Sequence, residues 1–191
     1  GFAHLYLFDL KTKKLKSQIT TGEWFVSDLY FYDNQDDWLY FSACGYYKNI
    51  DPYFKQFFRC RLNGQEINCL SPEEGCHDID ISPNKNCYLD TYSTISNSPI
   101  SYLKKMNGEI ICHVETTDIS RLSQLNWVPP KRFCIKGRDG KTDIYGNIYF
   151  PSNFNKNIKY PLIDHIYPGP QIFRTPTQFN LYSTRSQSAW F

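Results

Sequence analysis

The side chains that could perform catalysis are few in this sequence, and their spacing fits no complete active site. A serine nucleophile on a strained strand-to-helix turn belongs to a G-x-S-x-G motif, and no G-x-S occurs in the 191 residues. Asp164 and His165 are adjacent in an apolar segment that we expect to be a strand. Because neighbouring strand residues point to opposite faces, this pair cannot form the orienting hydrogen bond of a catalytic triad. We therefore interpret Asp164 and His165 as structural residues.

The other histidines and the paired carboxylates give no recognisable metal-binding pattern. His4, His77 and His113 are scattered along the chain, and the absence of C-x-x-C argues against a zinc ribbon or a thioredoxin-type motif. We therefore expect neither a metal nor another cofactor. Glu73 and Glu74 could together grip a substrate amine, but they stand in a polar turn. Solvated turn residues are the better interpretation of this pair.

Seven cysteines are present, and an odd number cannot pair completely within one chain. Free cysteine usually behaves as a small buried hydrophobe, which is the interpretation we adopt. One disulfide is left open within a group of four, which are Cys60, Cys69, Cys76 and Cys87. The chain also lacks an N-x-[ST] sequon for glycosylation.

The composition indicates a globular, β-rich protein. Hydrophobic residues make up 41%, charged residues 21% and aromatic residues 17% of the chain. Tyrosine and phenylalanine favour the half-buried surface of strands. The net charge is +2 without a basic run, which disfavours nucleic acid as a partner. No apolar stretch approaches the ~18 residues that would cross a bilayer, so we expect no membrane span.

An internal repeat organises the first part of the chain. Residues Leu29–Asn34 match Ile79–Asn84 at a spacing of 50 positions, and Leu5–Leu10 match Phe57–Leu62 at a spacing of 52. Each unit contains four short strands within about 50 residues, which is the size of a β-propeller blade. The pattern predicts two four-stranded antiparallel units over residues 1–43 and 53–114, with a sandwich of four to eight strands as the alternative.

Turn residues support these strands. Asn63-Gly64 and Asn107-Gly108 are strong hairpin signals, because both residue types tolerate the positive φ of a tight turn. Residues 43–56 interrupt the repeat as a long insertion between strands. Loops of this length often carry function, but the four aromatic residues of this one are expected to cap the end of the sheet.

The pattern changes after Glu115. Thr117 or Asp118 can cap a short helix that runs to Leu125, and Val128-Pro129-Pro130 then stops it. Alternating residues next predict a hairpin of 132–136 with 142–150, followed by a short apolar strand over 160–167 and a helix over 177–191. This order indicates the start of a sheet-plus-helix domain. We therefore divide the chain into residues 1–115, a linker at 116–131, and residues 132–191.

Several motifs, in their order and spacing, resemble the dipeptidyl peptidase IV family of prolyl-oligopeptidase-like serine peptidases. The resemblance runs over essentially all 191 residues. The motifs are Gly1–Tyr6 (G-x-x-H-L-Y), Leu70–Gly75, Ile81-Ser82-Pro83, Asp139–Gly146, Lys159-Tyr160-Pro161 and Tyr167–Pro170 (Y-x-G-P).

The resemblance implies a mainly β chain. It would contain the last blades of an eight-bladed propeller, followed by the first strands and helix of an α/β-hydrolase domain. It also implies a catalytic role for Tyr167, whose counterpart in the family donates its hydroxyl to the oxyanion of the tetrahedral intermediate. Pro168 departs from the glycine or alanine often found next to that tyrosine and is expected to stiffen the turn. A tyrosine that only packs beside a turn is the alternative.

The implied function is that of a fragment of a serine exopeptidase that releases Xaa-Pro or Xaa-Ala dipeptides from peptide N-termini. The Ser-Asp-His triad would lie beyond Phe191, so the fragment alone is expected to be inactive. A related acylaminoacyl peptidase or oligopeptidase, or a non-catalytic propeller binding module, is the alternative. The expected partner is a peptide substrate, and a homodimer is left open. The family resemblance favours a periplasmic or extracellular location, while the cysteine count and the lack of sequons leave a cytoplasmic one open.

Overall fold

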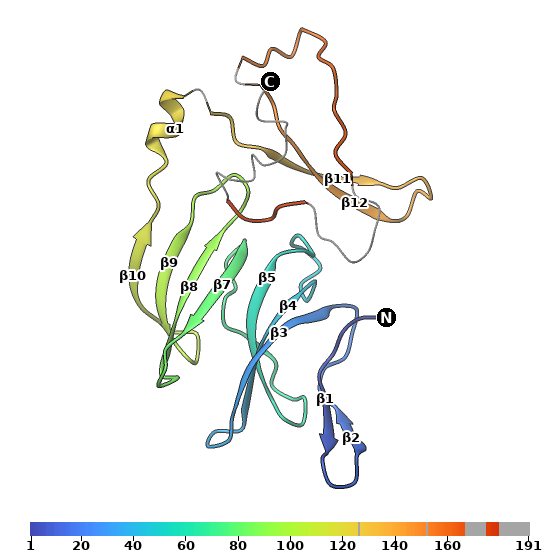
Figure 1. Cartoon of the computed structure of the whole chain (residues 1–191), viewed down its shortest axis with the longest axis vertical. Helices are drawn as coiled ribbons and strands as arrows, with labels where there is room; N and C mark the ends of the chain where they lie inside the picture. Colours follow the sequence, from blue (N-terminus) through green and yellow to red (C-terminus); the bar gives the residue numbers. More distant parts are fainter. Residues whose placement is uncertain (126, 152, 167–174, 180–191) are drawn as a thin grey trace. The chain divides into compact units, whose positions relative to one another are not determined.

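The computed structural model describes residues 1–125, 127–151, 153–166 and 175–179 (Figure 1). The chain divides into two compact units. The first contains Gly1–Tyr92 and Ile100–Glu115, and the second contains Ser93–Pro99 and Thr116–Phe191. Among the described residues, no helix is long and apolar enough to cross a membrane.

Two four-stranded sheets and a hairpin build the first unit. The first sheet has the order β3 (Phe25–Asp33), β4 (Trp38–Cys44), β5 (Lys55–Arg61) and β6 (Asn68–Cys69). The second has the order β10 (Ile110–Thr116), β9 (Ile100–Lys105), β8 (Cys87–Ser93) and β7 (Cys76–Ile81). The hairpin pairs β1 (Tyr6–Asp9) with β2 (Lys14–Gln18). Four-stranded units of sequential strands are therefore confirmed.

The predicted boundaries of these units, residues 1–43 and 53–114, are wrong. β4 pairs with β5 along seven consecutive positions, from Trp38↔Arg61 to Cys44↔Lys55, so the insertion lies inside a sheet and not between two sheets. A sequence repeat shows how often the strands recur, but it does not show which strand is the first of each sheet. The spacing of 52 positions correctly aligns β1 with β5, and each of these strands begins a hairpin with the next.

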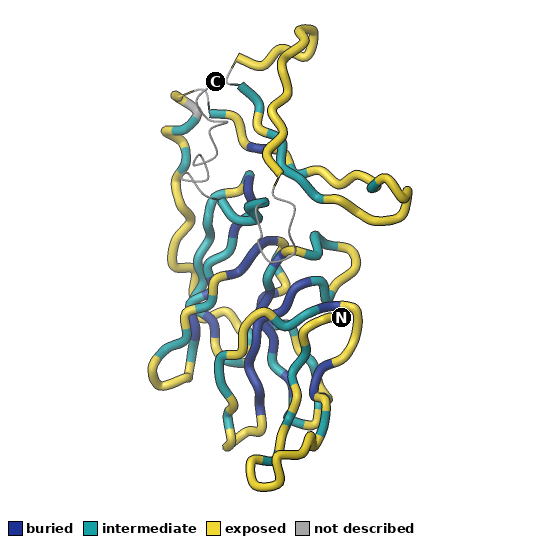
Figure 2. Tube along the Cα trace, turned by 45° about the vertical axis from the view of Figure 1, so that its right-hand side comes forward, coloured by how far each residue is buried: buried dark blue, intermediate teal, exposed yellow. Residues whose placement is uncertain are grey.

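The core of the first unit lies on both faces of β4, every residue of which is buried. Leu39, Phe41 and Ala43 point into one cluster, whereas Trp38 and Tyr40 point into another. This split follows from the two-residue period of a strand. The second cluster also contains Tyr88 and Leu70 and therefore joins the two sheets. Figure 2 shows the buried residues gathered in the central strands of this unit, such as β4, and the exposed ones in its turns and in edge strands such as β10.

The long loop between β4 and β5 packs Tyr46 onto the first sheet and buries Phe54, as the sequence predicts, whereas its other two aromatic residues, Tyr47 and Tyr53, are exposed. The Tyr46 ring lies 5.0 Å from the Phe58 ring and 5.3 Å from the Trp24 ring. Phe54 is buried. Ring pairs at these separations stabilise a core beyond their burial alone. The loop therefore covers the end of the sheet.

Asn63-Gly64 and Asn107-Gly108 form hairpin turns, with φ of +81° at Gly64 and +92° at Gly108. The two glycines differ in their surroundings. A Cβ at Gly64 would lie 2.2 Å from the Ile19 carbonyl oxygen, whereas a Cβ at Gly108 would meet Leu70 at 3.4 Å or more. The turn at Gly64 therefore needs glycine for space as well as for its backbone angle.

We expect Gly64→Ala to destabilise the protein more than the matched Gly108→Ala. Both changes place alanine at positive φ, so that cost is shared. Gly64→Ala adds a clash with fixed backbone, which should cost about 1–3 kcal/mol more, the usual range for overpacking. Urea denaturation of the two variants measures this difference. Equal losses of stability would show that the chain near Ile19 moves aside freely.

The second unit contains the helix and the hairpin that the sequence predicts. α1 (Ser120–Gln124) begins after Asp118, whose carboxylate accepts hydrogen bonds from the backbone N–H of Ser120 at 2.8 Å and from its hydroxyl at 3.1 Å. β11 (Lys131–Lys136) and β12 (Asp143–Ile148) then form an antiparallel hairpin.

The strand expected over 160–167 is not found in residues 160–166. Leu162 and Ile166 are 83% and 74% exposed, and no backbone ladder includes this segment. A short apolar segment becomes a buried strand only where neighbouring strands pair with it, and no described strand does so. Residues 177–179 are not helical, and the rest of the helix expected over 177–191 lies outside the described residues.

Candidate functional site

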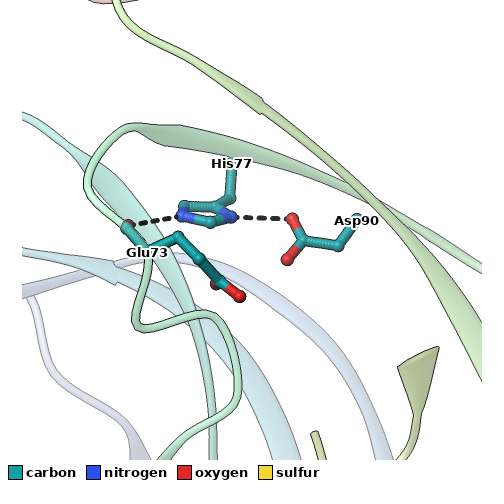
Figure 3. A group of neighbouring side chains, drawn as sticks. All are labelled: Glu73, His77 and Asp90. Carbon is teal, nitrogen blue, oxygen red and sulfur yellow. Dashed lines mark hydrogen bonds and ion pairs between the residues drawn. The ribbon is translucent and has the colours of Figure 1, made fainter. Parts of the chain in front are cut away.

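Four ionisable side chains gather inside the first unit where the first sheet passes into the second. Glu73 lies in the connector between β6 and β7, which we define as residues 71–75, and His77 lies in β7. Asp90 comes from β8 and Lys104 from β9. The register pairs Tyr88 with Lys104, which places Asp90 and Lys104 on one face at diagonal positions. We call these four residues the buried quartet (Figure 3 shows Glu73, His77 and Asp90).

Hydrogen bonds connect every member of the quartet. Nδ1 of His77 lies 2.7 Å from Oδ1 of Asp90, and Nε2 lies 2.9 Å from the backbone oxygen of Glu73. Nζ of Lys104 donates to Oδ2 of Asp90 at 2.8 Å and to both carboxylate oxygens of Glu73 at 2.8 and 3.0 Å. The side chains of His77, Asp90 and Lys104 are fully or almost fully buried. The network thus ties the connector to three strands.

Electrostatics within the quartet favour a charged lysine. Burial alone would lower the pKa of Lys104, but its hydrogen bonds and ion pairs with Asp90 and Glu73 outweigh burial and raise that pKa. Nearby, burial raises the pKa of Tyr88, whose hydroxyl donates to the Leu70 carbonyl at 2.8 Å. The surroundings of the quartet therefore stay uncharged while Lys104 carries a full charge.

The quartet does not fit a metal site, although Glu73, His77 and Asp90 offer three ligand atoms within 4.8 Å of one another. Lys104 donates to both carboxylates and so occupies the position from which a cation would bind them. Both nitrogens of His77 also face hydrogen-bond acceptors, so neither can act as a base towards a substrate. The arrangement can hold structure together, but it offers no reactive group.

A comparison with known proteins identifies the family of the chain from the part that contains Glu73, His77 and Asp90. Residues 1–99 match the family model for the dipeptidyl peptidase IV (DPP IV) N-terminal region. The chain belongs to the DPP IV family. It is 26% identical over 181 residues to the probable dipeptidyl-aminopeptidase B of Arthroderma otae, covering 89% of this chain and 19% of that protein. It is 24% identical over 174 residues to the probable dipeptidyl peptidase 4 of Arthroderma benhamiae, covering 89% of this chain and 22% of that one.

The crystal structure of Porphyromonas gingivalis dipeptidyl peptidase 4 shares the fold. It superposes with a TM-score of 0.76 at 22% identity, covering 98% of this chain and 26% of that one. The four-stranded antiparallel sheets of this DPP IV family chain are thus similar to those of a solved dipeptidyl peptidase. The chain spans about a fifth of the length of the curated relatives.

The catalytic residue predicted from the sequence, Tyr167, lies outside the described residues. Asp164 and His165 are exposed and belong to no strand, so the alternation on which their interpretation rested does not apply to them. Glu74 is exposed, as a solvated turn residue should be. For Glu73 that interpretation is wrong, because its carboxylate binds the buried Lys104.

The histidines and cysteines are distributed through both units. His4 hydrogen-bonds with the Thr20 hydroxyl at 3.2 Å and donates to the Gly22 carbonyl at 3.1 Å, and His113 packs its ring 5.3 Å from Tyr102. All seven cysteines are free, including the four for which a disulfide was left open. Cys44, Cys60 and Cys76 are buried, as small hydrophobes would be, but Cys112 and Cys134 are exposed.

Sequence reasoning missed the buried quartet. The one available signal was the charged Asp90 between Tyr88 and Tyr92, since alternate strand residues share a face. A carboxylate in an otherwise aromatic row needs a buried partner. Neither His77 nor Lys104 could be assigned as that partner without the register of β8 and β9.

Proposed function

We propose that this chain is part of a serine exopeptidase that releases dipeptides of the Xaa-Pro or Xaa-Ala type from peptide N-termini. The observation that carries the proposal is the family match over residues 1–99. The names of the curated relatives agree with it. In this assignment, residues 1–115 form the last blades of the propeller, residues 116–131 a linker, and residues 132–191 the start of an α/β-hydrolase domain.

Catalysis is assigned to the full-length protein. The described residues bring together no nucleophile, base and acid, and the quartet is closed to substrate. Tyr167 is the one residue of this chain to which we assign a catalytic role, as donor to the oxyanion. That assignment follows from the Y-x-G-P motif of residues 167–170. The nucleophile, Asp and His of the triad are assigned to a further part of the protein.

The test is a comparison of two reporter substrates with the full-length protein. One is a chromogenic Xaa-Pro substrate with a free amino terminus, and the other is the same dipeptide with an acylated terminus. A dipeptidyl peptidase must bind the ammonium group, and a charge-assisted hydrogen bond is worth about 1.5–3 kcal/mol. We therefore expect kcat/KM to be on the order of 10- to 100-fold higher for the free substrate.

Each alternative predicts a different result in the same assay. Preference for the acylated reporter would indicate an acylaminoacyl peptidase, and cleavage of longer internal sequences would indicate an oligopeptidase. No cleavage of any reporter by folded protein would indicate a binding module. The isolated 191-residue chain is the negative control. Turnover by that control, abolished by a serine-directed inhibitor, would contradict the assignment of the triad to a further part of the protein.

A further inference from the structure

Both ring nitrogens of His77 face hydrogen-bond acceptors, which determines how many protons the His77–Asp90 pair must hold. His77 directs Nδ1 at a carboxylate oxygen of Asp90 and Nε2 at the backbone oxygen of Glu73, and both of these groups accept hydrogen bonds. A neutral imidazole carries one hydrogen and can satisfy only one of the two acceptors. If Asp90 were protonated instead, it would supply the missing hydrogen from the other side. In either arrangement, the His77–Asp90 pair holds one proton more than a neutral ring beside an ionised carboxylate.

We propose that the buried quartet is a proton-dependent latch, which holds the connector at residues 71–75 against the second sheet only while the His77–Asp90 pair keeps its extra proton. Loss of that proton leaves either Nε2 without a hydrogen towards Glu73 or a bare Nδ1 facing the Asp90 carboxylate. A buried polar atom that loses its partner is costly, so the connector opens.

The ions of the quartet balance when the latch is closed. Glu73 and Asp90 supply two negative charges, and Lys104 with the protonated pair supplies two positive ones. Charges out of contact with water need such pairing. Loss of the extra proton leaves a net negative charge inside the unit, which adds to the cost of the lost hydrogen bond.

The other titratable groups facing this space do not respond near neutral pH. They are Cys69 of β6, Tyr88 and Tyr92 of β8, and Lys104 of β9. Burial raises the pKa of Cys69 to about 11 and raises the pKa of Tyr88 and of Tyr92 above the ordinary tyrosine range. Cys69, Tyr88 and Tyr92 therefore stay neutral near neutral pH, and Lys104 stays charged.

The connector lies where a latch would act on both sheets of the first unit. It joins β6, the edge of the first sheet, to β7, the edge of the second. Ser71 fixes the start of the connector, because its hydroxyl and carbonyl accept hydrogen bonds from Phe57 and Gln56 of β5. The quartet fixes the middle of the connector through Glu73, which contributes its carboxylate to Lys104 and its carbonyl to His77. The latch would therefore control how firmly two neighbouring sheets are held to each other at their joint.

Hydrogen exchange of the full-length protein, followed by mass spectrometry from about pH 5.5 to pH 9, tests the latch. After correction for intrinsic exchange, protection of residues 71–77 should fall as the pH rises. The fall should approach about tenfold per pH unit over the range in which the open connector has lost the proton and the closed connector keeps it, because one proton is linked to closing. Protection of the β4–β5 ladder, with which no quartet side chain forms a hydrogen bond, should stay constant. A connector whose protection does not change with pH, or changes only in parallel with that ladder, would overturn the proposal.

Two variants make the test specific. His77→Gln keeps a hydrogen-bonding side chain but cannot take up a proton, so its connector should be weakly protected at every pH. His113→Gln changes a histidine on the exposed edge strand β10 and should keep the wild-type profile. A wild-type slope in His77→Gln would also overturn the latch. If His77→Gln does not fold, the comparison of connector with ladder in the wild-type protein still decides the question.

Discussion

Lys104→Met should destabilise the first unit by about 3–5 kcal/mol, the usual cost of removing one partner from a buried ion pair. The side chain of Lys104 is 1% exposed and forms ion pairs with two carboxylates, those of Glu73 and Asp90. Methionine fills much of the same volume, so the loss reports the charge and not a cavity. Asp90 is left buried with a negative charge that only His77 can balance. Urea denaturation, read as a shift of the midpoint, measures the effect.

The neighbouring residue provides a matched control. Lys105 pairs with Glu109 at 3.0 Å, but its side chain is 52% exposed. Exposed ion pairs typically contribute about 0.2–1 kcal/mol, so Lys105→Met should change stability by no more than that. Losses of similar size in the two variants would mean that water reaches Lys104, and that the quartet is an ordinary surface network.

A double substitution separates charge imbalance from lost contacts. Lys104→Met combined with Asp90→Asn removes one charge of each sign, leaving Glu73 with His77. Replacing both members of a buried pair often costs far less than removing one. We therefore expect the double variant to be more stable than the sum of the two single losses predicts. Strict additivity would indicate that Lys104 and Asp90 do not interact.

Much of the strand pattern could be predicted from the sequence because turns and alternation are local properties. Two hairpins are set by local turn residues at positive φ, in Asn63-Gly64 and Asn107-Gly108. The cap of α1 by Asp118 is equally local. The grouping of strands into sheets was not predictable in this way, since β4 pairs with β5 across a ten-residue loop that looks like a boundary in the sequence.

The buried quartet depends on contacts between distant positions, which explains why the sequence did not reveal it. His77 and Asp90 are 13 positions apart, and Lys104 lies 31 positions from Glu73. Glu73 and Glu74 are identical in type and adjacent, yet one binds a buried lysine and the other is exposed. The register of β8 with β9 places Lys104 on the face of Asp90, and the fold of the connector brings Glu73 within 2.8 Å of Lys104 Nζ.

Tyr167→Phe in the full-length protein should lower the turnover number by about 10²–10³, the usual effect of removing one donor to an oxyanion. The change deletes a single oxygen and little volume, so stability should hardly move. In the proposed role, the hydroxyl acts on charge that develops during acyl transfer. The Michaelis constant should therefore stay nearly unchanged while kcat and kcat/KM fall together.

Tyr160 supplies a control of the same residue type from the same part of the chain. Its hydroxyl accepts a hydrogen bond from the backbone N–H of Asn155 at 2.9 Å and so is engaged in holding a loop. Tyr160→Phe should leave the turnover number within a few-fold of wild type, since that hydroxyl is given no part in the reaction. Full activity in Tyr167→Phe would reduce Tyr167 to a packing residue beside Pro168. A loss of activity that appears as a raised Michaelis constant would instead assign its hydroxyl to substrate binding, because such an interaction is made equally in the ground state and the transition state.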